Sequence, residues 1–170
     1  MQSRDTIAGA REHGLFLRPI EHFARLLPGL IALGGTRALD VVVIGGGAAG
    51  VEIAMALAHR LADPVARVVL VTGGSAPLAD APPSARAAVL RALRRLRVTV
   101  LQELCVAVES DHVRLANGAR VACDAPIIAT AGSAPPWLAG SGLALDDRGR
   151  IRTGPTLQSV SHPDVLAAGD

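Results

Sequence analysis

The chain has 170 residues and a formal net charge of +2, and 50% of its residues are hydrophobic. This length suits one domain with a sizeable core, and the small net charge does not indicate binding to nucleic acid. Only 2% of the residues are aromatic, so aliphatic side chains must fill that core. Together with 18 glycines, this composition favours an α/β protein over a β-sandwich.

The sequence does not indicate a membrane span, a signal peptide, a metal site or a reactive cysteine pair. No apolar window of 18 residues lacks charge, and the N-terminus lacks the apolar stretch of a signal peptide, so we expect a cytoplasmic chain. Cys105 and Cys123 form no CxxC pattern, and the histidines have no metal-ligand spacing. We therefore expect buried structural cysteines, no metal site and no catalytic acid, base or nucleophile.

Residues 1–14 are polar and weakly patterned, and residues 17–33 predict one short amphipathic helix. In "LRPIEHFARLLPGLIAL", Pro19 suits the first helical turn, and Pro28 with Gly29 is expected to end the helix. "LDVVVIG" is a continuous apolar run of strand length, typical of a buried parallel strand. A second helix is expected from about Ala48 to Leu61.

The rest of the chain predicts strands of two kinds. Residues 65–72 and 98–101 predict further buried strands, and the helix between them carries arginines on a face expected to be solvated. Residues 104–123 predict an antiparallel meander with an Asn117-Gly118 hairpin turn. "APIIATAG" predicts a returning buried strand, "DDRGRIRTG" a hairpin and "DVLAAGD" a last strand. This order predicts an α/β fold, a Rossmann-like parallel sheet with an inserted antiparallel β-meander.

Residues 45–50 match G-x-G-x-x-G directly after a predicted strand and at the start of a predicted helix, which makes the pattern a dinucleotide fingerprint. Gly45 permits the tight turn, Gly47 lets a pyrophosphate approach the backbone, and Gly50 lets the helix lie close to the strand. Free N–H groups and the positive end of the helix favour the phosphate charge. A glycine turn that only packs a helix on a sheet is the less favoured alternative.

The second predicted strand ends in Val71-Thr72-Gly73-Gly74, without the acid that holds the ribose 2′-OH of NAD or an arginine for the 2′-phosphate of NADP. Thr72 or loop N–H groups could serve the ribose, so the sequence leaves NAD versus NADP open. Glu52, expected in the first helical turn, either complements the helix dipole or contacts the nicotinamide end of the cofactor.

The glycine segment, the meander, "IIATAGSAPPWL" and "TLQSVSHPDVLAAGD", in this order, resemble the pyridine nucleotide-disulfide oxidoreductase superfamily of flavoproteins. The chain looks most like type II NADH dehydrogenase-like members, and it is also similar to the oxidoreductase module fused to selenide, water dikinase. The resemblance implies a connector segment with the short helix (1–38), an NAD(P)-binding Rossmann-like domain with the meander (39–138), and a return segment that ends in the start of an FAD-domain motif (139–170).

The resemblance also implies roles for individual residues. Glu52 matches the family's Glu near the nicotinamide, and Asp170 after Gly169 matches the Asp that binds the flavin's ribityl or a nearby phosphate. The family's A-T-G at the end of the returning strand corresponds to residues 129–132, with the glycine one place late. The predicted cofactor-binding residues are Gly45, Gly46, Gly47, Ala48, Ala49, Gly50, Glu52, Thr72, Gly73, Thr130, Gly132, Gly169 and Asp170.

The function that the resemblance implies is the NAD(P)H-binding domain of an FAD-dependent oxidoreductase, which passes hydride from NAD(P)H to flavin and on to a quinone or another acceptor. No second glycine fingerprint precedes residue 40, so we expect the chain alone to lack turnover and not to retain FAD. Its partners would be NAD(P)H and the flavin half of the same polypeptide. The sequence leaves open whether the intact protein associates peripherally with the inner membrane and whether it forms a homodimer. The alternative is a noncatalytic dinucleotide-binding or interaction module. A methyltransferase is disfavoured because no acid follows the second strand.

Overall fold

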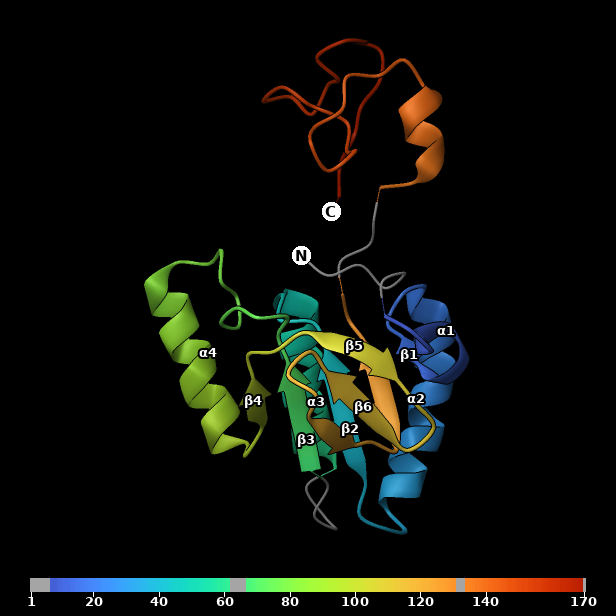
Figure 1. Ribbon diagram of the computed structural model, residues 1–170. Coiled ribbons are helices and arrows are strands. Elements are labelled where there is room, and N and C mark those ends of the chain that lie inside the picture. The colour runs from blue at the N-terminus through green and yellow to red at the C-terminus, as the bar shows by residue number, and fades with distance from the viewer. Residues whose placement is uncertain (1–6, 62–66, 131–133, 170) are drawn as a thin grey trace. The chain divides into compact units, whose positions relative to one another are not determined.

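The computed structural model describes residues 7–61, 67–130 and 134–169, and the chain divides into two compact units, Met1–Ala131 and Gly132–Asp170 (Figure 1). The helices are α1 (Ala10–His13), α2 (Ile20–Gly34), α3 (Ala48–Arg60), α4 (Pro83–Arg95) and the 3-10 helix η2 (Pro136–Gly140). The strands are β1 (Leu15–Phe16), β2 (Asp40–Ile44), β3 (Arg67–Val71), β4 (Thr99–Leu101), β5 (Cys105–Val108), β6 (His112–Leu115), β7 (Arg120–Ala122) and β8 (Ala125–Ile128). The three segments predicted for the intact protein, with boundaries at residues 38 and 138, stay predictions.

The first unit contains two sheets. Five parallel strands lie in the order β1-β8-β2-β3-β4, and three antiparallel strands lie in the order β5-β6-β7. This arrangement confirms the predicted α/β fold with its inserted meander. The chain leaves β2 toward β3 and β4 on one side, while β8 pairs with the other side of β2, so the strand order reverses there. Ligands of doubly wound sheets bind at such a reversal, outside the carboxyl ends of the strands.

Strand β2 is buried on both faces, as its continuous apolar run predicts. Val41 and Val43 pack in one core with the helices, and Val42 and Ile44 pack in a second core with the meander. All four side chains are at most 1% exposed. The parallel sheet therefore lies between a helical layer and the meander (Figure 1).

Helix α2 is longer than the sequence predicts. The expected stop at Pro28 and Gly29 is wrong, because the helix runs through Pro28 to Gly34. Pro28 removes one backbone hydrogen bond from the helix. Leu30, in the turn after the proline, is buried in the helical core, and a Cβ on Gly34 would lie 2.6 Å from Leu61 Cδ2. Burial of the last turns against the core thus offsets the missing hydrogen bond.

The second unit has little regular structure. The predicted hairpin is present, since Leu145 and Ile151 form an antiparallel bridge and Asp146 N donates to Arg150 O at 2.8 Å. The predicted last strand is absent from the described part of the segment, where Leu166 makes only an isolated bridge to Gln158. A strand needs a neighbouring ladder to be stable, and this unit offers only isolated bridges.

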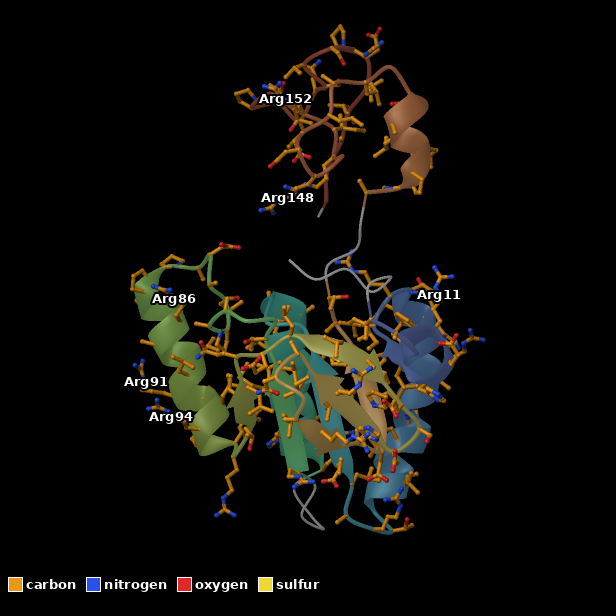
Figure 2. All side chains as sticks on the ribbon, viewed as in Figure 1. Arg11, Arg86, Arg91, Arg94, Arg148 and Arg152 are labelled. Atoms are coloured by element: carbon orange, nitrogen blue, oxygen red, sulfur yellow. The ribbon has the colours of Figure 1, made fainter. Side chains whose placement is uncertain are left out.

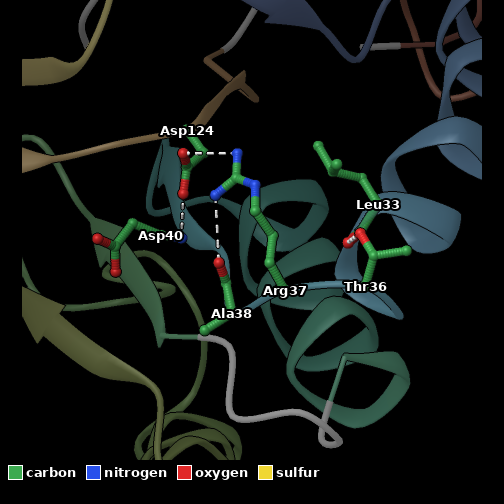
Figure 3. A network of polar contacts seen from close by, with 6 residues as sticks. All are labelled: Leu33, Thr36, Arg37, Ala38, Asp40 and Asp124. Atoms are coloured by element: carbon green, nitrogen blue, oxygen red, sulfur yellow. Dashed lines mark hydrogen bonds and ion pairs between the residues drawn. The ribbon is translucent and has the colours of Figure 1, made fainter.

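A polar network joins the amino ends of the central strands (Figure 3). Asp124, just before β8, accepts hydrogen bonds from Arg37 Nη2 at 2.9 Å and from Asp40 N at 2.8 Å. Arg67, the first residue of β3, donates to Asp40 Oδ1 at 2.8 Å. The network therefore holds β2, β3 and β8 together at the end of the sheet opposite the glycine segment.

Replacing Asp124 with alanine should lower the free energy of unfolding by about 1–2 kcal/mol, because the change removes the Arg37 ion pair and the acceptor for Asp40 N–H. Urea denaturation followed by circular dichroism measures the change. Asp80→Asn is the control, since this exposed carboxyl forms no ion pair within the described residues, and it should change stability by less than about 0.5 kcal/mol.

The same carboxyl should make stability depend on pH. The Arg37 hydrogen bond, and next the Asp40 backbone N–H, hold the pKa of Asp124 below its ordinary value near 3.8. A carboxyl whose pKa falls on folding contributes its full stabilisation above the unfolded pKa and loses it as the pH falls through the folded pKa. The stability difference between wild type and Asp124→Asn should be largest above about pH 4 and vanish in stronger acid. A difference that grows on acidification would contradict this assignment.

Candidate functional site

The candidate site lies where the carboxyl ends of β2, β3 and β8 meet. Gly45, directly after β2, has a φ of 135° and donates its N–H to Val71 O of β3 at 2.8 Å. Ala129, directly after β8, donates its N–H to Ile44 O at 2.9 Å. The three strand exits are therefore joined by backbone hydrogen bonds at the point where the strand order reverses.

Three of the glycines in segment 45–50 are required by close backbone packing. A Cβ on Gly45 would lie 2.4 Å from Ala129 O, and a Cβ on Gly50 would lie 1.9 Å from Gly45 O. A Cβ on Gly46 would lie 2.8 Å from Thr72 Cβ. The predicted roles of Gly45 in the turn and of Gly50 in helix–strand packing therefore have a geometric basis.

Gly47 differs from its neighbours because neither packing nor torsion requires a glycine there. Its φ is −75°, and a Cβ at this position would meet no heavy atom within 4 Å. The missing side chain thus leaves open space directly at the start of α3. A glycine turn that served packing alone would not need this space, so Gly47 supports the interpretation as a ligand site.

The start of α3 offers free donors to that space. Gly47 is the N-cap of α3, and no side chain caps the helix. The first N–H groups of a helix have no partner within the helix, and together with the helix dipole they attract a phosphate. Ala48 is exposed and Ala49 is half-buried, so the backbone there remains within reach of a ligand. These residues fit a pyrophosphate.

Thr130 closes the site on the side of β8. Its backbone N lies 3.0 Å from the position that a Cβ on Gly45 would take, and its buried Oγ1 has no hydrogen-bond partner. The other such atom among the described residues, His112 Nε2, lies 3.5 Å from a Glu109 carboxylate oxygen. An unpaired buried hydroxyl is costly, so Thr130 fits a site whose ligand completes its hydrogen bonding.

The polar groups at the end of β3 form hydrogen bonds within the protein. Thr72 is 6% exposed, and its hydroxyl donates to Ser75 O, with Leu101 O at 3.4 Å as a second acceptor. Gly73 donates its N–H to Glu103 O at 3.0 Å. The two donors that the sequence offered for the ribose are therefore engaged within the fold.

Leu78 belongs to the site although the sequence pattern did not single it out. Its N–H donates to Gly46 O at 2.8 Å, and its φ is 51°. The loop after β3 thereby folds back onto the glycine segment. A positive φ at a leucine has no signature in a single sequence, so only the structure could reveal this contact.

Glu52 is the fifth residue of α3 and lies on the exposed side of the helix. Its expected place in the first turn is wrong, because α3 begins at Ala48 and carries no acid in its first turn. The interaction of a charge with the helix dipole falls off within the first turn. The dipole interpretation of Glu52 therefore loses its basis, and the contact to the nicotinamide end stays a prediction.

The predicted flavin contacts belong to the second unit. Gly169 is exposed with a φ of 117°, and Asp170 lies outside the described residues. Gly132, predicted at the NAD(P) site, also lies outside them. The flavin contacts of Gly169 and Asp170 therefore stay predictions. The structure brings together segment 45–50, Thr72, Gly73 and Thr130 in the first unit.

The two cysteines are buried in the core between the sheets, and neither forms a disulfide. Burial raises the pKa of the Cys105 thiol to about 11 and that of the Cys123 thiol to about 12, so both are neutral at physiological pH.

No cluster of three or more metal-ligating side chains occurs within residues 7–61, 67–130 and 134–169. Over the same ranges, no helix combines the length and apolar character needed to span a bilayer.

The arginines of α4 lie apart from the glycine segment. Figure 2 shows Arg86, Arg91 and Arg94 on the side of α4 that faces away from the sheet. A hollow of about 280 Å³ on this helix is lined by Ala88, Arg91, Ala92 and Arg95. Because every lining residue belongs to one helix, this hollow is not part of the site, and the arginines form the solvated face that the sequence predicts.

Comparisons with known proteins show the family and the fold of the chain. The sequence profile described as pyridine nucleotide-disulphide oxidoreductase matches residues 2–170. The crystal structure of reduced CoADR-RHD from Bacillus anthracis aligns with a TM-score of 0.74 and 26% identity, over 97% of this chain and 29% of that chain. No curated protein sequence matches the chain.

Two further structures show the same fold at lower identity. NDH2 from Plasmodium falciparum in complex with NADH aligns with a TM-score of 0.72 and 14% identity, over 95% of this chain and 39% of that chain. A covalent putidaredoxin reductase–putidaredoxin complex aligns with a TM-score of 0.69 and 23% identity, over 91% of this chain and 37% of that chain. The chain thus spans well under half of each of these three chains.

Gly47→Ala and Gly50→Ala should separate ligand binding from packing. Gly47→Ala should change the free energy of unfolding by less than about 1 kcal/mol but weaken binding of a dinucleotide at least about tenfold, because the methyl group enters the open space. Gly50→Ala should instead destabilise the fold by more than about 2 kcal/mol, because its Cβ would meet Gly45 O. Thermal unfolding and calorimetric titration measure both effects. Unchanged affinity in a folded Gly47→Ala variant would contradict a phosphate at this position.

Proposed function

Because the chain belongs to the pyridine nucleotide-disulphide oxidoreductase family, we propose that its first unit is the NAD(P)H-binding part of an FAD-dependent oxidoreductase. The observation that carries the proposal is the open space at Gly47, beside the uncapped start of α3. Packing explains the other glycines of the segment but leaves this one without a structural purpose. NDH2, which shares the fold, was solved in complex with NADH.

In this proposal each part of the site has its own task. The N–H groups at Ala48 and Ala49 bind the pyrophosphate, and Gly47 lets it approach the backbone. Thr130 donates its buried hydroxyl to the bound cofactor, and Glu52 orients the nicotinamide end. Bound NAD(P)H supplies a hydride for flavin, and from there electrons pass to a quinone or another acceptor. The chain's own contribution is to bind and position the cofactor.

The second unit supports a further part of the proposal. Four large apolar side chains are at least half exposed there: Trp137 (68%), Leu157 (50%), Val160 (57%) and Leu166 (70%). Exposed large apolar side chains are stabilised when another polypeptide covers them and removes them from water. We propose that these side chains pack against the flavin half of the intact protein. The cytoplasmic or peripheral membrane location and the homodimer stay predictions. The similarity to the module fused to selenide, water dikinase also stays a prediction.

A noncatalytic dinucleotide-binding module is the second candidate. It is favoured by one observation, namely that β3 ends without an acid or an arginine for the ribose. Such a module would also bind NAD(P)H, so binding alone does not separate the two candidates. Reduction of flavin by NADH in the longer protein would support the oxidoreductase.

Calorimetric titration of the 170-residue chain with NADH and with NADPH tests the proposed function. We expect saturable binding of at least one cofactor with a Kd below about 1 mM, because the glycine segment and the helix start are preformed. The chain alone should not oxidise NADH in the presence of a quinone, as followed by the absorbance of the reduced nicotinamide. The folded chain would have no dinucleotide site if neither cofactor produced heat up to millimolar concentration.

A further inference from the structure

The exit of β3 lacks the side chain that usually binds the adenosine ribose. Gly73 and Gly74 stand at this position with φ values of 80° and 87°, and neither carries a side chain. Thr72, just before them, engages its hydroxyl with Ser75 O. The strand that supplies the acid in most dinucleotide sites therefore leaves the position open.

The neighbouring strand brings an acid to this position. Strand β4 pairs with β3 so that Leu101 lies opposite Val71, and both backbones then continue side by side. Thr72 donates its N–H to Leu101 O at 3.0 Å, and Gly73 donates its N–H to Glu103 O at 3.0 Å. Glu103 is half-buried and forms no ion pair within the described part of the chain. The backbone of Glu103 thus lies directly beside Gly73, and the carboxylate that it carries has no cation partner within the described residues.

An apolar side chain accompanies this acid. A Cβ on Gly73 would lie 4.0 Å from Leu104 Cδ2, and Leu104 is 42% exposed. Small-molecule sites combine apolar surface with a few placed polar groups. A carboxylate that accepts hydrogen bonds from hydroxyls, next to an exposed aliphatic side chain, suits a ribose and the base attached to it.

We propose that Glu103 and Leu104 form the adenosine end of the dinucleotide site, and that Glu103 selects NADH over NADPH. The proposal rests on the proposed function and adds the cofactor that the site prefers. The Glu103 carboxylate accepts hydrogen bonds from the ribose hydroxyls of NADH and repels the negatively charged 2′-phosphate of NADPH. Leu104 contacts the adenine face in both cofactors.

Asp80 is an acid in the loop that follows β3. It lies exposed in the loop between β3 and α4, near the turn in which Ala81 donates its N–H to Leu78 O at 2.9 Å. No hydrogen bond joins Asp80 to the exit of β3 within the described residues, whereas the backbone carbonyl of Glu103 accepts one from the Gly73 N–H. Asp80 therefore serves as the matched control for a carboxylate of the same charge.

Calorimetric titration of the 170-residue chain and its variants with NADH and NADPH tests the proposal. Wild type should bind NADH roughly tenfold to a hundredfold more tightly than NADPH, which is the range of a hydrogen bond to a charged group. Glu103→Gln should remove this preference and Glu103→Arg should reverse it, while Asp80→Asn should keep it. Leu104→Ala should weaken both cofactors and leave their ratio unchanged.

The outcomes separate this inference from the proposed function. If wild type binds a cofactor and the folded Glu103→Gln and Glu103→Arg variants keep its ratio of NADH to NADPH affinity, the inference is overturned. The proposed function then still stands. Loss of the preference in Asp80→Asn also overturns the inference, because another acid would then select the cofactor. Binding of neither cofactor by folded wild type overturns the proposed function and this inference together. Circular dichroism and thermal unfolding establish that each variant is folded.

Discussion

The site depends on the close packing of three backbone segments at Gly45, namely the exits of β2 and β8 and the first turn of α3. There the chain leaves β2 between the exit of β8 and the first turn of α3, so closely that a Cβ on Gly45 or Gly50 would meet a carbonyl oxygen at 2.4 or 1.9 Å. This packing directs the start of α3 toward the point where the strand order reverses. The same packing places Thr130 N 3.0 Å from the position that a Cβ on Gly45 would take. The packing glycines thus create the position at which Gly47 is left open.

The two ends of the parallel sheet have opposite character. At the amino ends, Asp124 accepts hydrogen bonds from Arg37 and from Asp40 N, so the polar groups there are paired. At the carboxyl ends, α3 begins without a side-chain cap and Thr130 Oγ1 is buried without a partner. Paired polar groups stabilise the fold, whereas unpaired ones are costly unless a ligand completes them. The paired polar groups and the unpaired groups that a ligand could complete therefore lie at opposite ends of the same sheet.

The meander covers one face of the sheet and also shapes the site. Its buried side chains pack on Val42 and Ile44, which keeps β2 inaccessible to water on the face that the helices leave open. The chain enters the meander from β4 through Glu103 and Leu104. The same connection that starts the cover thus passes beside Gly73 at the exit of β3. The insertion places side chains at the site that a simple βαβ repeat would not supply.

The sequence by itself determined the order of the elements from β2 to β8, the buried central strand and the glycine fingerprint. These follow from apolar patterns and glycine positions, which act through residues close together in the chain. The stop expected at Pro28 was wrong because burial of Leu30 against distant residues outweighs a local hydrogen bond. Only the tertiary structure decided that Glu103 lies beside Gly73 and that the Thr130 hydroxyl lacks a partner. Both depend on strand pairing between residues far apart in sequence, which no local pattern encodes.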